Sequence, residues 1–389
     1  MIDYENTVSR AVRDLKPSGI RRFFDIAAEM DDVISLSIGE PDFVTPWHIR
    51  EAGIISLEQG KTHYTSNAGI AELREEIALY LERRFKLKYD ADQIILTVGG
   101  SEGIDVAIRT LVEPGDEVLI PEPSFVCYDP LTRLAGGIPK PIITREEDEF
   151  RLTAQALKDA ITPKTKLLVL PFPNNPTGAI MSKEDLKEIA AVLKDTNIYV
   201  LSDEIYAELT YGRNRHVSIA SIDDMAERTV IVSGFSKAFS MTGWRLGYLV
   251  APKPLIKMML KIHQYGIMSS PSTAQYAAIE AMRNGDEDVR MMRSEYNVRR
   301  KFIWKGLEDL GFPCFEPLGA FYIFPNISRL GMSSEEFCEK LIYEQRLAVV
   351  PGNAFGESGE GHVRISYAYS KENLKEALKR LKVFVEEHS

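Results

Sequence analysis

Cysteine is scarce in this chain of 389 residues, which contains only Cys127, Cys314 and Cys338. The three are far apart, and no Cys-x-x-Cys pair or cluster of cysteine and histidine has the spacing of a zinc site. The sequence therefore predicts no disulfide framework and no metal site. A sparse, odd set of cysteines suits a reducing compartment, so we expect a cytoplasmic protein.

Long apolar runs and an excess of positive charge are also missing. No stretch approaches 18 uncharged apolar residues, and residues 1–16 alternate charges instead of forming the apolar core of a signal peptide. We therefore expect no membrane span. With 47 Lys and Arg against 57 Asp and Glu, the formal net charge is -10, which argues against nucleic acid as the main partner.

The chain does contain short, nearly continuous apolar runs that alternate with helical patterns, within an ordinary globular composition. The runs lie at residues 94–98, 118–121, 167–171, 199–202, 230–233 and 247–250. Each is typical of a strand buried on both faces. Between two of them, apolar residues recur at helical spacing from Leu186 to Leu193, and Ser182 is a good N-cap candidate. This alternation predicts an α/β fold with a mostly parallel sheet.

The last hundred residues have a different pattern. A long charged helix is expected at 286–310, strands at 320–324 and near Leu347 and Val363, and helices near 334–345 and after residue 370. The terminal helix carries Leu374, Leu378, Leu381 and Val385 on one face. We therefore expect three parts: an N-terminal segment, residues 1–44, that packs with the small domain, a large α/β domain, residues 45–285, and a small α+β domain, residues 286–389.

A glycine-rich turn at residues 99–103 allows two interpretations. It fits the G-x-S-x-G pattern of a hydrolase nucleophile elbow, with Ser101 as nucleophile and Asp203 and His362 following in the required order. The alternative is a turn that offers backbone N–H groups at a helix N-terminus, where phosphate binds without a nucleophile.

Two charged side chains follow apolar strands further along the chain. Asp203 ends one such run, and Lys237 follows the next after a short Gly/Ser linker, with Arg245 eight residues later. A lone Asp here is usually a helix cap and a lone Lys a solvated charge. The carboxyl ends of parallel strands lie at one edge of a sheet, where ligands bind. Because Asp203 and Lys237 both follow such strand ends, we expect them to belong to a functional site.

Eight motifs then occur in the order and spacing of the class I and II aminotransferases of fold type I. They are GEPDF, TVGGSEG, PFPNNPTG, SDEIY, SGFSKAFSMTGWRLG, GAFYIFP, PGNAFG and HVRIS. The chain resembles most the bacterial and archaeal branch that contains aspartate and aromatic amino acid aminotransferases, from about Ile34 to Tyr367. The resemblance implies a large domain with a mostly parallel seven-stranded sheet, a smaller α+β domain, and bound pyridoxal 5'-phosphate.

The resemblance also implies how the cofactor is held. Lys237 is the lysine that forms a Schiff base with it, and its amine suits both nucleophile and base. The phosphate is assigned to the backbone at Gly100, Ser101 and Glu102, to Arg245, and to Tyr64 from the neighbouring subunit. Family members add a serine shortly before the lysine, but Gly234 stands three residues before Lys237. Ser233 and Ser236 therefore remain open as alternatives.

The remaining matches concern the cofactor ring and the substrate. Phe125 stacks on the ring, Asn175 and Tyr206 bind its phenolic oxygen, and Asp203 keeps its nitrogen protonated. Arg364 and Gly39 bind the substrate α-carboxylate, for which a bidentate guanidinium is well suited. Asn175 is also assigned to the substrate, and Tyr206 is counted with Lys237 and Asp203 among the catalytic residues.

The expected activity is transfer of an amino group from an L-amino acid to a 2-oxo acid. Aspartate, aromatic amino acids and alanine are the expected donors, and 2-oxoglutarate is the expected acceptor. The resemblance implies a homodimer with shared active sites. Two alternatives are kept: a pyridoxal-phosphate-dependent lyase of the same fold, and, more distantly, the hydrolase with Ser101.

Overall fold

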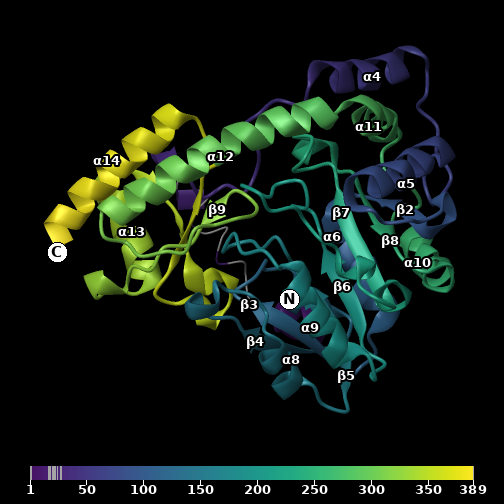
Figure 1. The fold of residues 1–389 in the computed structure, drawn as a ribbon, viewed down its shortest axis with the longest axis horizontal. Coiled ribbons are helices and arrows are strands. Elements are labelled where there is room, and N and C mark those ends of the chain that lie inside the picture. The colour runs from purple at the N-terminus through teal and green to yellow at the C-terminus, as the bar shows by residue number, and fades with distance from the viewer. Residues whose placement is uncertain (1, 16–18, 20–22, 24, 27–28, 389) are drawn as a thin grey trace.

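A seven-stranded sheet forms the centre of the larger part of the protein, as seen in a computed structural model that describes residues 2–15, 19, 23, 25–26 and 29–388 (Figure 1). In spatial order the strands are β2 (Ile94–Thr97), β8 (Gly247–Val250), β7 (Thr229–Gly234), β6 (Tyr199–Asp203), β5 (Thr165–Leu170), β3 (Glu117–Glu122) and β4 (Ile138–Ile143). Only β8 runs antiparallel to its neighbours. The predicted α/β fold with a mostly parallel sheet is confirmed.

All six predicted apolar runs are strands of this sheet, and β4 is a strand that the apolar pattern does not reveal. β4 contains Pro139 and Pro141, which lack the N–H group that a ladder needs. It pairs only with β3 and lies at the edge, where proline is tolerated.

Side chains along each central strand alternate between the two faces of the sheet. In β2, Ile94 and Leu96 pack with helices α5 and α11, whereas Ile95 packs with α6 and α10. Both faces are therefore covered, which explains why the central strands are almost continuously apolar.

Helices of the larger part are α4 (Trp47–Glu58), α5 (Ala71–Phe85), α6 (Gly99–Leu111), α7 (Tyr128–Leu134), α8 (Ala154–Ala160), α9 (Lys183–Leu193), α10 (Lys253–Gly266) and α11 (Ser272–Asn284). Helix α9 begins as predicted, because Ser182 accepts from the N–H of Asp185 at 3.1 Å while the Asp185 carboxylate accepts from the N–H of Ser182 at 2.8 Å. Its apolar face, from Leu186 to Leu193, is buried.

The smaller part lies to one side of the sheet and is joined to it by the long helix α12 (Asp286–Asp309), which crosses the top of Figure 1. Its other elements are β9 (Tyr322–Ile323), α13 (Ser334–Gln345), β10 (Leu347–Ala348), β11 (Val350–Pro351), β12 (Val363–Ser366) and α14 (Lys371–His388). On α14, Leu374 and Leu381 are buried as expected, and Phe384 joins them.

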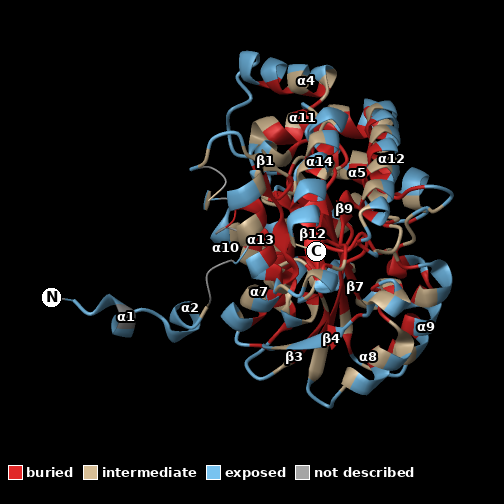
Figure 2. Ribbon diagram, turned by 90° about the vertical axis from the view of Figure 1, so that its left-hand side faces the viewer, coloured by how far each residue is buried: buried red, intermediate tan, exposed pale blue. Residues whose placement is uncertain are grey.

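The N-terminal residues contribute β1 (Ile34–Ser35), which pairs in parallel with β10, while the short helices α1 (Tyr4–Thr7) and α2 (Arg10–Arg13) lie outside the main body (Figure 2). Residues 1, 16–18, 20–22, 24 and 27–28 of the predicted N-terminal segment lie outside the described residues. We propose that this segment packs with the small domain, and the β1–β10 pair supports the proposal.

We propose domain boundaries at residues 45 and 286. Helix α12 supports the second boundary, because Val289 in its first turns packs in the core of the large domain, whereas Met292 and residues beyond it pack in the core of the small one. Tyr206 of the large domain also packs into the small-domain core. The two cores therefore meet beside the sheet edge where the candidate site lies.

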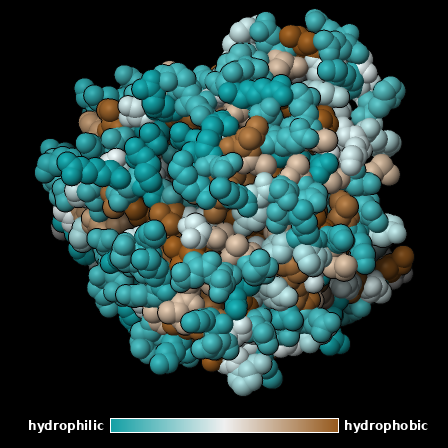
Figure 3. All heavy atoms as spheres, turned by 45° about the vertical axis from the view of Figure 1, so that its right-hand side comes forward, coloured by the Kyte–Doolittle hydropathy of each residue, from teal (hydrophilic) through white to brown (hydrophobic). Residues whose placement is uncertain are grey.

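The face in Figure 3 is mostly hydrophilic, with hydrophobic areas between the polar ones. Large apolar side chains that are exposed in the single chain include Val44 (71%), Trp47 (57%), Tyr64 (83%) and Tyr265 (87%). Within the described residues, no helix is long and apolar enough to cross a membrane.

Candidate active site

A cleft of about 350 Å³ opens at the carboxyl ends of the parallel strands. It contains all the predicted site residues except Glu102 and Tyr64; those present are Gly39, Gly100, Ser101, Phe125, Asn175, Asp203, Tyr206, Lys237, Arg245 and Arg364. Strand direction explains the convergence, since β6 ends at Asp203 and β7 ends three residues before Lys237.

The Lys237 amine lies in the wall of this cleft and donates to the carbonyl oxygen of Gly39 at 2.5 Å. Burial lowers the pKa of Lys237 to about 8; the carboxylate of Glu40 opposes this shift, and the charges of Arg364 and Arg245 add to it. An amine with this pKa is more readily deprotonated near neutral pH than an ordinary lysine.

Asp203 is a buried carboxylate with two fixed donors. The Tyr128 hydroxyl donates to Oδ2 at 2.7 Å, and the backbone N–H of Ile205 donates to Oδ1 at 3.2 Å. Burial raises the pKa of Asp203, and these two hydrogen bonds oppose that shift. No helix begins directly after β6, so Asp203 is not a helix N-cap.

The N-terminus of α6 forms a wall of the cleft that could bind an anion. Gly100 and Ser101 line the cleft in the first turn, where backbone N–H groups have no helical partner. Arg245 adds a guanidinium from the other side. Gly99, with φ of +72°, lets the Arg245 side chain lie close to the start of α6, because a Cβ at Gly99 would lie 2.6 Å from Nη2 of Arg245.

Glu102 lies in the same turn, but its side chain points away from the cleft. It accepts from the backbone N–H of Val98 and interacts with Nδ1 of His263 at 2.6 Å. Of the two serines left open by the sequence, Ser236 lines the cleft, while the Ser233 hydroxyl donates to the carbonyl oxygen of Glu204 at 3.2 Å.

Arg364, which is only 3% exposed, provides a buried cation in the cleft. Its Nη1 donates to Oδ1 of Asn175 at 2.9 Å, and its Nη2 donates to the carbonyl oxygen of Ser37. Burial lowers the pKa of Arg364, and its Nε is buried without a hydrogen-bond partner. Since a buried donor without a partner is unfavourable, this guanidinium is suited to an anionic ligand.

Several cleft residues were not predicted, above all Tyr128 and Tyr322. The Tyr322 hydroxyl lies 2.8 Å from that of Tyr206. The sequence held weak signals for both, because Tyr128 follows Phe125 by three positions and Tyr322 lies within the GAFYIFP motif. Their partners are distant in sequence, so neither contact can be derived from spacing.

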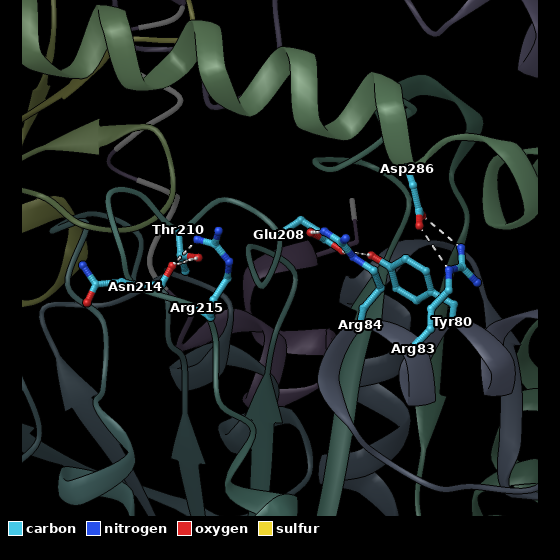
Figure 4. Close-up of polar contacts among 8 residues, drawn as sticks. All are labelled: Tyr80, Arg83, Arg84, Glu208, Thr210, Asn214, Arg215 and Asp286. Atoms are coloured by element: carbon cyan, nitrogen blue, oxygen red, sulfur yellow. Dashed lines mark hydrogen bonds and ion pairs between the residues drawn. The ribbon is translucent and has the colours of Figure 1, made fainter.

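Glu208, two residues after Tyr206, is held by side chains of α5, and Figure 4 shows these contacts. Glu208 accepts from Nε of Arg84 at 2.8 Å and Nη2 at 2.5 Å, and from the Tyr80 hydroxyl at 2.5 Å. The neighbouring Arg83 pairs instead with Asp286 at the start of α12, with 2.9 Å between Nη2 and Oδ1. Two adjacent arginines of α5 thus contact the Tyr206 segment and the helix that joins the domains.

The residues of the hydrolase alternative do not come together. His362 interacts with Glu146 at 3.3 Å and stacks on Phe324 with 5.0 Å between the ring centres, and it does not line the cleft. Ser101 therefore has no histidine beside it within the cleft.

Comparison with known proteins identifies the family. "Aminotransferase class I and II" matches residues 31–381. The Bacillus subtilis protein YugH is 54% identical over 379 residues, which is 97% of this chain and 98% of that protein. The solved aromatic aminotransferase from Pyrococcus horikoshii is 45% identical with a TM-score of 0.90, over 95% of this chain and 99% of that one. The structure of the aspartate aminotransferase from Thermus thermophilus with maleate is 39% identical with a TM-score of 0.93. The match covers 97% of this chain and 99% of that one. The chain therefore belongs to the class I and II aminotransferase family and is an aminotransferase.

Proposed function

We propose that this aminotransferase holds pyridoxal 5'-phosphate in the cleft through the Lys237 amine and passes an amino group from an L-amino acid to a 2-oxo acid. The observation that carries the proposal is the partly buried Lys237 amine, with its lowered pKa, in one cleft with Asp203, Arg245 and Arg364. An amine, an anion and two cations are what such a cofactor and its substrate need.

The residues present fit this cofactor. The phosphate would be held by the N-terminus of α6, by Arg245 and by Ser236. Phe125 would stack on the ring, while Asn175 and Tyr206 would hydrogen-bond its phenolic oxygen. When bound, pyridoxal phosphate supplies an electron-accepting ring that stabilises negative charge at the substrate Cα.

The remaining cleft residues would move a proton or bind a charged group of the cofactor or substrate. Lys237 holds the cofactor and then moves a proton at the substrate Cα. Asp203 favours the protonated form of the ring nitrogen, since a nearby carboxylate raises the pKa of a basic group. Arg364 and the backbone of Gly39 orient the substrate α-carboxylate.

We infer that aspartate, aromatic amino acids or alanine serve as donors and that 2-oxoglutarate is the acceptor. The names of the relatives, aspartate and aromatic aminotransferases, support aspartate and aromatic amino acids as donors. The cleft residues contain no arginine or lysine beyond Lys237, Arg245 and Arg364. A second substrate carboxylate would therefore need a cation from another part of the assembly.

We propose a homodimer with shared active sites, located in the cytoplasm. Tyr64 is 83% exposed and lies outside the cleft of its own chain, which suits a residue that reaches a neighbouring subunit. The exposed Val44, Trp47 and Tyr265 offer apolar surface for such a contact. The three cysteines are free, as is common in a reducing compartment.

A screen of single amino acids separates transfer from the lyase alternative. Each amino acid is added to the holoenzyme, the visible absorbance of the cofactor is followed, and the products are analysed. Transfer yields a 2-oxo acid without ammonia and stops after one turnover until a 2-oxo acid is added. Continuous release of ammonia would instead show a lyase.

A further inference from the structure

Tyr322 lines the cleft from β9 and is 1% exposed, and its hydroxyl has one hydrogen-bond partner among the described residues. That partner is the Tyr206 hydroxyl at 2.8 Å, and within the described part of the chain neither hydroxyl has another hydrogen-bond partner. A pair of hydroxyls makes one hydrogen bond between them and leaves one proton for a third group.

The surroundings decide which hydroxyl keeps that proton. A Cβ at Gly39 would lie 2.4 Å from the Tyr322 oxygen, so this hydroxyl packs against the Gly39 backbone. Tyr206 lines the cleft together with Asn175, where the ring oxygen of the cofactor would lie. If Tyr206 donated to Tyr322, the Tyr322 proton would be buried without an acceptor, which is unfavourable.

We propose that Tyr322 is a positioning residue whose hydroxyl donates to Tyr206 and thereby directs the Tyr206 proton at the ring oxygen of the cofactor. This inference rests on the proposed cofactor site.

Arg364, which would bind the substrate, also favours Tyr322 as the donor in its hydrogen bond with Tyr206. Its guanidinium carbon lies 4.5 Å from the centre of the Tyr322 ring. Burial raises the pKa of Tyr322, and the positive charge of Arg364 opposes that rise, which makes the hydroxyl a better donor. Tyr322 is therefore in contact with groups of both the substrate and the cofactor subsites.

The test is a pH titration of the visible absorbance of the holoenzyme. Hydrogen bonds to the ring oxygen favour the less protonated, more negative form of the bound cofactor. Tyr322→Phe weakens the hydrogen bond from Tyr206 to the ring oxygen. The midpoint of the absorbance titration should therefore rise by roughly 0.3 to 1 pH unit, the size expected for one hydrogen bond. Tyr206→Phe should raise it further.

A double variant shows whether Tyr322 acts through Tyr206. If it does, adding Tyr322→Phe to Tyr206→Phe leaves the midpoint unchanged. Tyr211→Phe is the matched control, because Tyr211 is also buried in the small-domain core and donates to the carbonyl oxygen of Ala320 away from the cleft. It should lower the melting temperature without moving the midpoint.

Two results would overturn the inference: a Tyr322→Phe midpoint equal to that of the wild type, or an equal rise in the presence and absence of Tyr206. Absence of a visible band in the wild-type protein would instead contradict the proposed cofactor site itself.

Discussion

Burial is the common cause of the unusual side chains in the cleft. It lowers the pKa of Lys237 to about 8, lowers that of Arg364 and raises that of Asp203. In each case the charged form is destabilised because solvent is removed, and specific neighbours oppose or reinforce the effect. A ligand that brings opposite charges into the cleft should stabilise the charged forms of these side chains, as solvent would.

Tyr128 is expected to keep Asp203 ionised. Tyr128→Phe removes the hydrogen bond of 2.7 Å to Oδ2, so the pKa of Asp203 should rise further. The acid limb of the pH profile of kcat should move to higher pH, while turnover well above that limb changes little. Asp203→Asn, measured beside it, should bind the cofactor and yet turn over more slowly by orders of magnitude. An unchanged acid limb in Tyr128→Phe would show that Asp203 does not depend on this donor.

Arg364 is expected to serve every substrate, because each carries the same α-carboxylate. Arg364→Lys keeps the charge but loses the paired hydrogen bonds, and both half-reactions should weaken by about 2–4 kcal/mol in transition-state binding. Single-turnover kinetics with one amino acid and one 2-oxo acid give the two values. Loss confined to one substrate would mean that Arg364 contacts a side chain instead.

The motifs predicted most of the cleft residues but not the contacts between them. Tyr128 and Asp203 are 75 positions apart, and Tyr206 and Tyr322 are 116 apart. The fold of the large domain brings Tyr128 to Asp203, and packing of the small domain brings Tyr322 to Tyr206, so no local pattern marks either contact. Glu102 was predicted at the correct turn, but its side-chain direction depends on His263 of α10, 161 positions away.

At the scale of elements, the ends of strands and helices position the site. Apolar continuity predicted the central strands, whereas the edge strand β4, with Pro139 and Pro141, has too weak a pattern. The Tyr206 segment has no helix or strand of its own after β6, and its position depends on the contacts of Glu208 with α5.

Adjacent arginines of α5 allow a matched test of that anchor. Arg84→Gln removes two hydrogen bonds from Glu208, whose side chain is only 4% exposed, and should lower the free energy of unfolding by roughly 1–3 kcal/mol. Arg83→Gln breaks a pair whose side chains are 35% and 41% exposed, and should cost less than about 1 kcal/mol. Urea unfolding measures both, and equal losses would show that burial of Glu208 does not matter.

At the scale of the whole molecule, the exposed Tyr64 raises the question of which subunit it serves. In the proposed homodimer, Lys237→Ala and a disruptive Tyr64 variant would each leave two damaged sites. In a hybrid dimer with shared sites, one site collects both lesions and the other has none, so activity should return. Subunit exchange must be verified with a labelled chain. If activity stays low after exchange, Tyr64 acts within its own subunit.

The central claim is that Lys237 carries the cofactor, and one labelling measurement tests it. The purified holoenzyme is treated with borohydride, which fixes the cofactor to the amine that holds it, and the digested protein is analysed by mass spectrometry. We expect the mass of the reduced cofactor on the peptide that contains Lys237, and none on that peptide in Lys237→Ala. Label on a different lysine, or full activity in Lys237→Ala, would contradict the account.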